Sequence, residues 1–254
     1  MIANYHTHTA RCHHADGTDR EYVEAAIAAG MTTLGFSDHT PQFYPNGFVS
    51  NMRMTPEEAP EYVRSIRELA REYQDKIRIY VGFEAEYWPR MFGKLWEYCR
   101  ELGVDYLILG QHFYDGDNTL YFGSRLEEKE MLTLYVDRVL EALSTGCFSY
   151  VAHPDLPNFV GDPAWYSSEM RRLCEGAKKM NVPLEVNMLG FVGHRQYPCE
   201  RFFKIAREVG NEIVLGCDAH TPKSLSDIES QNALLAFANR LGLSPLPEIS
   251  LRAV

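Results

Sequence analysis

The sequence predicts an α/β protein built around a parallel β-barrel. Seven short apolar segments alternate with seven helix-like segments along the 254 residues, and this alternation is typical of parallel strands covered by helices. The apolar segments are hydrophobic at consecutive positions, as expected for strands that are buried on both faces. An open parallel sheet fits the same pattern, so the barrel and the open sheet both remain possible from the pattern alone.

The elements follow one another in a regular order. Strands are expected at residues 2–6, 33–37, 77–84, 104–110, 148–152, 183–187 and 212–217, and helices at residues 19–30, 56–74, 89–101, 126–145, 163–180, 198–209 and 222–241. The first helix has an acidic start at Asp19, an apolar face that includes Val23 and Ile27, and a closing Gly30. Several later helices have proline at or beside their first residue, where a missing N–H costs least. Segments 40–55 and 113–125 are long for connections of this kind, so we expect them to be active-site loops.

Composition limits the classes of protein that the chain can represent. With 45% hydrophobic residues, residues 1–254 can bury a large core, and we expect a single domain. No segment approaches the roughly 20 apolar residues of a membrane span, and no signal-peptide pattern opens the chain. We therefore expect a cytoplasmic protein with no membrane partner. The six cysteines are scattered and are expected to be free thiols.

The formal net charge is −10, and no basic stripe interrupts the acidic sequence. Tight nucleic-acid binding uses many Lys and Arg contacts to phosphates. We therefore expect no nucleic-acid partner, and a small molecule is the expected substrate. The sequence does not indicate the oligomeric state.

Histidine or an acidic residue follows most of the predicted strands. "EIVLGCDAH" runs from a buried strand into Asp218 and His220, and the same arrangement produces His6, His8, His39, Glu84, His112 and His153. A parallel barrel gathers the C-terminal ends of its strands on one face, so these side chains should converge there and bind metal. His6 and His8 point to the same side of an extended backbone. Glu84 can bridge two ions, and Glu86, one step further along the same face, is the alternative bridge.

Eight motifs in a fixed order carry a family resemblance. They are "NYHTHT", "RCHHADG", "GFSDHTP", "VGFEAEY", "GQHFYDG", "VAHPD", "LEVN" and "GCDAHTP". Together they resemble the histidinol-phosphatase branch of the polymerase and histidinol phosphatase (PHP) family. The resemblance implies a distorted seven-stranded (β/α) barrel, with the active site at the C-terminal ends of the strands and a centre of three divalent ions. It also implies phosphomonoesterase activity in histidine biosynthesis.

The resemblance assigns ligands position by position. One ion would be held by His6, His8, Glu84 and Asp218, a second by Glu84, His112 and His153, and a third by His14, His39 and His220. Glu84, Asp218 and His220 are also the expected catalytic residues. His14 is preferred to His13 because the family places a ligand eight residues after the first histidine, within a Cys-x-His-Ala motif; the sequence leaves open whether Asp16 or His13 joins or replaces it. Zinc, iron and manganese all fit imidazole and carboxylate ligands.

A count of charges favours a phosphorylated substrate. Three divalent ions, two carboxylates and a bridging hydroxide leave about +3 on the site, which suits a phosphate monoester dianion. Arg195, in "GFVGHRQYP", matches an arginine that the branch uses for substrate phosphate, and a guanidinium fork suits phosphate oxygens. Arg53 and Arg125 are further candidates for substrate binding. Asn187 is expected to orient the substrate or a metal-bound water.

Three other functions fit parts of the sequence. An amidohydrolase would commonly bridge its metals with a modified lysine, where this chain has Glu84. A PHP-family nuclease, or a phosphoesterase acting on another ester, is the main alternative, although the acidic charge disfavours a nuclease. A binding module that has lost catalysis is disfavoured by the complete set of ligands.

Overall fold

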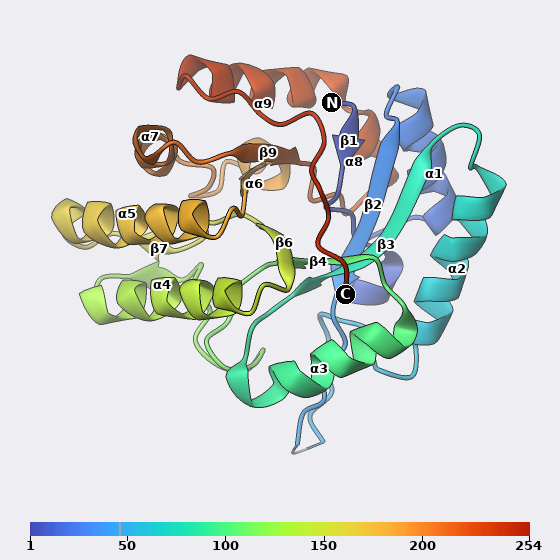
Figure 1. Ribbon diagram of the computed structural model, residues 1–254, viewed down its shortest axis with the longest axis horizontal. Coiled ribbons are helices and arrows are strands. Elements are labelled where there is room, and N and C mark those ends of the chain that lie inside the picture. The colour runs from blue at the N-terminus through green and yellow to red at the C-terminus, as the bar shows by residue number, and fades with distance from the viewer. Residues whose placement is uncertain (46) are drawn as a thin grey trace.

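The computed structural model describes residues 1–45 and 47–254, and its main sheet curves almost into a closed barrel (Figure 1). The parallel strands follow the order β1-β2-β3-β4-β6-β8-β9. They are β1 (Ala3–Asn4), β2 (Thr33–His39), β3 (Arg78–Ala85), β4 (Tyr106–Leu109), β6 (Phe148–Val151), β8 (Leu184–Asn187) and β9 (Ile213–Gly216). A parallel bridge between Thr7 and Ala219 links the extensions of the first and last strands. The structure thus confirms the barrel and excludes the open sheet.

The long helices surround the strands (Figure 1). They are α1 (Asp19–Ala28), α2 (Ala59–Glu72), α3 (Pro89–Leu102), α4 (Lys129–Ser144), α5 (Pro163–Lys179), α7 (Glu200–Val209) and α9 (Ile228–Arg240). The ends of these helices follow local chemistry. Thr18 and Glu21 form a capping box at the start of α1, and α3 ends at Gly103 in the left-handed conformation.

The structure corrects the predicted helix 222–241, which is two helices. A short helix, α8 (Pro222–Ser226), precedes α9, and the side chain of Asp227 accepts a hydrogen bond from the backbone N of Ser230. Asp227 therefore caps a new helix instead of continuing the first one. The sequence analysis also missed four short elements: the 3₁₀ turn η1 (Ala10–Cys12), the helix α6 (Met188–Val192), and the paired strands β5 (Arg125–Leu126) and β7 (Asn158–Phe159).

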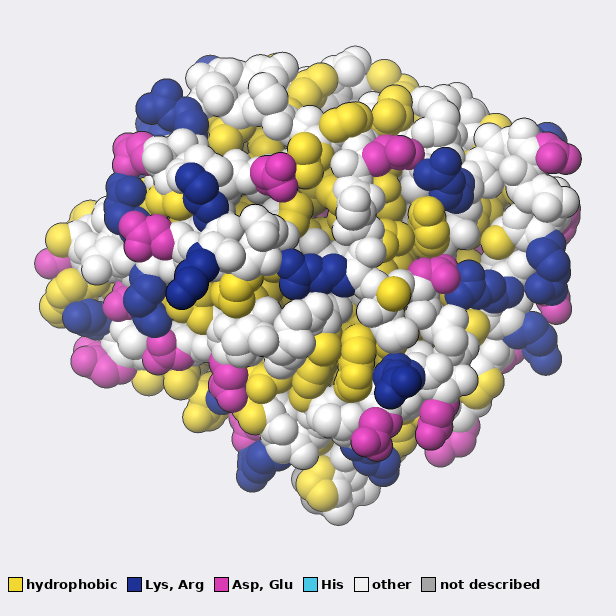
Figure 2. All heavy atoms as spheres, viewed as in Figure 1, with side chains coloured by type: hydrophobic (Ala, Val, Ile, Leu, Met, Phe, Trp, Pro, Cys, Tyr) yellow, Lys and Arg dark blue, Asp and Glu magenta, His cyan; other side chains and the backbone are white. Residues whose placement is uncertain are grey.

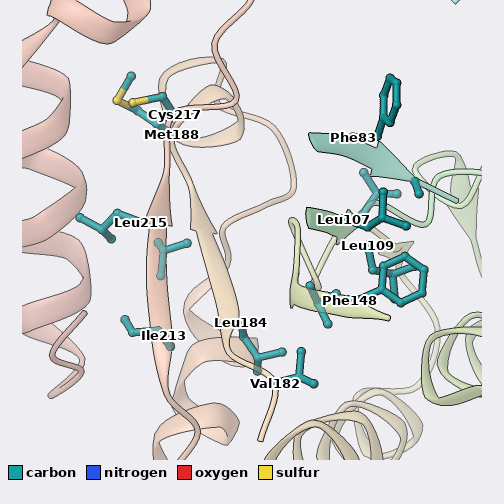
Figure 3. Close-up of a cluster of buried hydrophobic side chains, with 14 of the residues drawn as sticks. Phe83, Leu107, Leu109, Phe148, Val182, Leu184, Met188, Ile213, Leu215 and Cys217 are labelled. Carbon is teal, nitrogen blue, oxygen red and sulfur yellow. The ribbon is translucent and has the colours of Figure 1, made fainter. Parts of the chain in front are cut away.

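Strand residues alternate between two apolar layers, although nearly every position is hydrophobic. Leu107, Leu109, Ile213 and Leu215 belong to the outer layer between the strands and the helices, part of which is shown in Figure 3. Residues in between point into the barrel, where the inner layer consists of Ala3, Tyr5, Tyr106, Ile108, Tyr150, Ala152 and Val214. The side chain of Tyr106 occupies space that only glycine leaves open: a Cβ on Gly82 would lie 2.4 Å from the Tyr106 carbonyl oxygen and 2.6 Å from its ring. The barrel interior is therefore filled by side chains below the C-terminal ends of the strands.

The segment after α9 crosses the N-terminal end of the barrel (Figure 1). Ile249 and Leu251 pack against the inner layer, and the backbone N of Arg252 donates to Ser149 Oγ at 3.0 Å. On this face Lys and Arg side chains are interspersed with Asp and Glu, without a continuous basic stripe (Figure 2). Among the described residues, no helix combines the length and the apolar character that a membrane crossing requires. The six cysteines, all within the described residues, are free as predicted.

Candidate metal centre

All nine predicted ligands converge at the C-terminal ends of the strands. A cavity of about 520 Å³ opens there, and it is lined by His8, His14, His39, Met52, Glu84, His112, Phe113, Tyr121, Leu189, Arg195, Tyr197, Asp218 and His220. His6 and His153 lie against Glu84 at the base of the site. Strand register contributes to this placement, because the pairing of β2 with β3 sets His39 directly beside Glu84.

His6, His8, Glu84 and Asp218 form one compact set. Nε2 of His6 lies 3.6 Å from Glu84 Oε1 and 3.5 Å from Asp218 Oδ1. Nε2 of His8 lies 3.6 Å from Glu84 Oε2 and 3.2 Å from Asp218 Oδ1. Ligand atoms about 2.1 Å from a tetrahedral zinc ion are separated from one another by about 3.4 Å. The spacing of these atoms therefore fits a single ion between them.

One polar atom of each residue in this set lacks a hydrogen-bond partner. Within the described part of the chain, His6 Nε2, His8 Nε2, Glu84 Oε2 and Asp218 Oδ1 are buried without one. An unsatisfied buried polar group costs about 1–3 kcal/mol. Four such atoms aimed at one point are accounted for by a cation, so the residues present fit a divalent metal.

Glu84 also connects this set with the other predicted ligands. Its Oε1 lies 3.5 Å from His112 Nε2 and 2.9 Å from His153 Nε2. Its Oε2 lies 2.9 Å from His39 Nδ1, although these two atoms do not form a hydrogen bond. Glu84 thus occupies a bridging position.

The remaining predicted ligands are imidazoles that lie next to His8, and two of them stack on each other. The ring centroids of His14 and His220 are 4.9 Å apart, and those of His8 and His220 are 4.2 Å apart. The ligand atoms of Cys12, His14 and His220 lie within 4.8 Å of one another, so the Cys12 thiol is also within reach of this position. His13 adopts a left-handed backbone with φ of 65°, which ends the 3₁₀ turn, and its side chain is exposed. Asp16 and His14 are exposed as well, but of these three residues only His14 lines the cavity.

Three buried acids fix the orientation of the histidines. Nδ1 of His6 lies 2.8 Å from Glu185 Oε1, Nδ1 of His8 lies 3.4 Å from Asp38 Oδ1, and Nδ1 of His112 lies 3.3 Å from Glu86 Oε1. A carboxylate on the far nitrogen sets the tautomer and increases the basicity of the ligand nitrogen. Glu86, the alternative bridge in the sequence analysis, therefore lies behind His112 instead of between ligand sets.

Sequence analysis missed Glu185 and Asp38 as site residues. Glu185 is fully buried, and besides His6 it accepts a hydrogen bond from the backbone N of His153 at 2.9 Å. Asp38 accepts one from the backbone N of His39 at 2.8 Å. The available signal was an acidic residue inside an otherwise apolar strand, in "LEVN" and "GFSDH".

The electrostatics of the site favour ionised carboxylates. Burial raises the pKa of Glu84, but His112, His39 and His6 lower it to well below its ordinary value. Burial also raises the pKa of Asp218, and His6 and His8 outweigh it and bring the pKa well below its ordinary value. Burial and the neighbouring His8 lower the pKa of His220 to about 4. Near neutral pH, His220 is therefore the uncharged imidazole that a metal requires.

Two of the predicted ligands have unusual backbone conformations. Asp218 has φ of 49° and His153 has φ of 30°. Positive φ is uncommon for residues other than glycine, and such strain concentrates at functional sites. At the ends of β9 and β6, these turns aim the two side chains at the common centre.

The predicted substrate-binding residues occupy four different environments. Arg195 lines the cavity, and its Nη1 donates to Tyr197 Oη at 2.9 Å. Asn187 is fully buried, and its Nδ2 donates to Glu185 Oε2 at 2.9 Å and to Asp218 Oδ2 at 3.1 Å. Asn187 thus orients a predicted metal ligand.

The other two arginines do not line the cavity. Arg53 is buried and pairs with Asp117, with Nε 2.9 Å from Oδ2. Arg125 is exposed and pairs with Glu127 at 2.9 Å. The structure therefore does not bring Arg53 or Arg125 to the position predicted for substrate phosphate, because each is held by a carboxylate elsewhere.

The predicted active-site loops supply cavity walls that the sequence did not identify by residue. Met52 comes from segment 40–55, and Phe113 and Tyr121 come from segment 113–125. Leu189 and Tyr197 complete this side of the cavity. The site combines a polar floor of histidines and carboxylates with largely apolar and aromatic walls.

Comparison with known proteins identifies the family. Residues 4–189 match the PHP domain. The chain belongs to the PHP domain family. A relative from Deinococcus radiodurans, named a probable histidinol-phosphatase, is 31% identical over 232 residues, which cover 87% of each chain. The family resemblance in the sequence is therefore confirmed.

Two solved structures share the fold. A histidinol phosphate phosphatase from Lactococcus lactis, complexed with zinc, L-histidinol and phosphate, is 20% identical with a TM-score of 0.71, and the match covers 98% of both chains. A putative histidinol phosphatase from Listeria monocytogenes is 20% identical with a TM-score of 0.72, covering 90% of this chain and 99% of that one. At these identities the likeness establishes the barrel architecture.

Proposed function

We propose that this PHP protein is a metal-dependent phosphomonoesterase that hydrolyses L-histidinol phosphate to L-histidinol and phosphate at a centre of three divalent ions. The observation that carries the proposal is the convergence of buried, unpartnered ligand atoms on a cavity that also contains Arg195. The name of the Deinococcus radiodurans relative supports the same activity. The Lactococcus lactis protein, in complex with L-histidinol and phosphate, supports the choice of substrate.

Three sets of residues would each hold one ion. His6, His8, Glu84 and Asp218 would hold one ion, Glu84, His112 and His153 a second, and His14, His39 and His220 a third. When bound, divalent ions polarise phosphoryl oxygens and lower the pKa of coordinated water. Glu84, Asp218 and His220 line the cavity and would touch the reacting atoms. Zinc, iron and manganese all suit this set of ligands.

Arg195 and the cavity walls would bind the rest of the substrate. The Arg195 guanidinium is positioned by Tyr197 and can donate charge-assisted hydrogen bonds to the non-bridging phosphate oxygens. Phe113, Tyr121, Met52 and Leu189 offer an apolar and aromatic surface to the leaving alcohol. A flat imidazole fits such a surface.

An assay of phosphate esters on protein of known metal content tests the function. The panel contains histidinol phosphate, other phosphomonoesters, phosphodiesters and single-stranded DNA, each with zinc, manganese or iron supplied. We expect the highest kcat/KM for histidinol phosphate, because a monoester dianion balances the excess positive charge better than a diester with one charge. Faster cleavage of a diester or of DNA would instead favour the nuclease alternative.

A further inference from the structure

Arg53 lies at the centre of a buried polar cluster behind the metal site. Its side chain is only 2% exposed. Nη1 donates to the carbonyl oxygen of Thr40 at 3.1 Å, and Nε donates to Asp117 Oδ2 at 2.9 Å. The guanidinium also lies 5.4 Å from the centroid of the Trp88 ring. Its donors are therefore directed at protein atoms instead of the cavity.

Glu86 connects this cluster with the predicted ligand His112. Glu86 is 1% exposed, and its Oε2 accepts hydrogen bonds from the backbone N atoms of His112 at 3.2 Å and Phe113 at 2.9 Å. Its Oε1 lies 3.3 Å from His112 Nδ1 and 3.5 Å from Arg53 Nη2. One carboxylate thus holds both the backbone and the ring of His112.

Arg53 is the cation that makes this arrangement possible. Asp117 and Glu86 are both buried acids, and both contact the same Nη2 of Arg53. Without that cation two buried carboxylates would lack a nearby positive partner, which is costly in a poorly solvated site. The Glu86 Oε1 that contacts His112 Nδ1 would then lose its countercharge.

The same contacts join the two loops that line the cavity. Arg53 belongs to segment 40–55 and Asp117 to segment 113–125, and these segments supply Met52, Phe113 and Tyr121 to the cavity wall. Trp88 Nε1 donates to the carbonyl oxygen of Phe113 at 3.2 Å and reinforces the connection. A substitution of Arg53 should therefore change the position of residues at the metal site and at the cavity mouth together.

We propose that Arg53 is a positioning residue: it neutralises Glu86, holds it against the imidazole of His112, and so fixes one metal ligand while tying both cavity loops to it. The inference rests on the proposed role of His112 as a ligand. It assigns Arg53 to the support of the metal site instead of to substrate phosphate.

Zinc competition on purified variants tests the inference without using activity. Wild type, Arg53→Met, Arg53→Lys, Glu86→Gln and the double variant Arg53→Met/Glu86→Gln are loaded with zinc and titrated with a chelator. Loss of such supporting contacts typically weakens metal affinity by about 10–100-fold. We expect that loss at one zinc position in Arg53→Met and Glu86→Gln, with partial recovery in Arg53→Lys. The double variant should resemble Glu86→Gln alone, because the two residues act through one contact.

Arg67 provides a matched control. It makes a two-pronged pair with Asp105, at 2.8 and 2.7 Å, among residues that do not line the cavity. Arg67→Met removes an Arg–Asp pair of similar bidentate geometry at a more exposed position, where the Arg67 side chain is 35% exposed, and should leave zinc affinity unchanged. Circular dichroism and thermal unfolding show whether each variant folds. If Arg53→Met fails to fold, the zinc affinities of Arg53→Lys and Glu86→Gln are compared with that of the wild type.

Two outcomes would overturn the inference. One is wild-type zinc affinity in Arg53→Met, which would return Arg53 to the candidates for direct phosphate binding. The other is a double variant whose loss is the product of the two single losses. Wild-type protein that binds zinc but fails to hydrolyse histidinol phosphate would contradict only the proposed substrate.

Discussion

Glu84 is the side chain on which most of the predicted ligands meet. Its two oxygens lie within 3.6 Å of nitrogen atoms of His6, His8, His39, His112 and His153. Glu84→Gln keeps the shape of the side chain but removes the negative charge that would be shared by two of the proposed ions. We expect it to abolish phosphatase activity and to lower the metal content, measured by elemental analysis alongside kcat. A Glu84→Gln protein with full metal content would contradict the bridging role.

Arg195 is predicted to bind phosphate without supporting the metals. Arg195→Ala should cost about 2–4 kcal/mol of transition-state stabilisation, or roughly 30-fold to 1000-fold in kcat/KM. Lysine should recover only part of the activity, because it lacks the planar fork. Tyr197→Phe removes the hydroxyl that Arg195 contacts and should have a smaller effect.

Two measurements separate this role from a structural one. Metal content should stay at the wild-type level in Arg195→Ala, and thermal stability should change by no more than about 0.5 kcal/mol, as for a surface substitution. Full activity toward histidinol phosphate would remove Arg195 from the site. Loss of metal would show that it supports the architecture.

Single residues differed in how far the sequence could place them. Most of the predicted ligands could be placed at strand ends because each follows an apolar run, and parallel strands bring such positions together; His14 was placed by the family resemblance alone. Glu185 could not be placed, because its contact with His6 depends on strand register across 179 residues. Arg53 was proposed for substrate binding because it lies in a long loop, but its pairing with Asp117 across 64 residues has no sequence signal.

Glycines at the strand ends make room for the buried acids of neighbouring strands. A Cβ on Gly110, just after β4, would lie 1.9 Å from Glu84 Oε1, and one on Gly216 in β9 would lie 1.8 Å from Glu185 Oε1. Gly110→Ala should therefore displace the Glu84 carboxylate, reduce metal content and destabilise the fold by about 1–3 kcal/mol. Elemental analysis and chemical unfolding measure the two effects.

Gly93→Ala is the matched control for this substitution. Gly93 lies inside α3, and a Cβ there meets no heavy atom within 4 Å. Alanine is also the better helix former, so stability should be equal or greater and metal content unchanged. Wild-type metal content and activity in Gly110→Ala would show that Glu84 has more freedom than its packing indicates.

The main elements were predictable and the small ones were not. Seven strands and the long helices follow from sustained apolar patterns and helix-start signals. β5 and β7 are two residues long each and lie outside any sustained apolar run, whereas β1, equally short, lies within the apolar start of the chain. α8 and α9 are separate because Asp227 caps the start of a new helix. The residues around Asp227 continue a helical pattern, so the sequence predicts one helix there.

At the scale of the whole molecule, metal binding should stabilise the fold. A ligand that binds only the folded state adds stability in proportion to the logarithm of its concentration, about 2.7 kcal/mol at 100 times Kd. Removing the metals leaves buried, unpartnered nitrogen and oxygen atoms. We expect a chelator to lower Tm reversibly, as measured by calorimetry before and after zinc is restored. An unchanged Tm in protein shown to have lost its metals would contradict this coupling.

The junction between the first and last strands has a consequence for how the chain reaches its native state. The backbone N of His8 donates to Ala219 O at 2.9 Å, the N of Ala219 donates to His6 O at 3.1 Å, and Cys217 N donates to Asn4 Oδ1 across 213 residues. Bringing such distant positions together costs roughly 5 kcal/mol of loop-closure entropy. An ion held by His6, His8 and Asp218 would crosslink the first and last strands. During synthesis, His6, His8 and Glu84 leave the ribosome before Asp218. We therefore expect closure of the barrel and complete binding of that ion to occur at the end of folding.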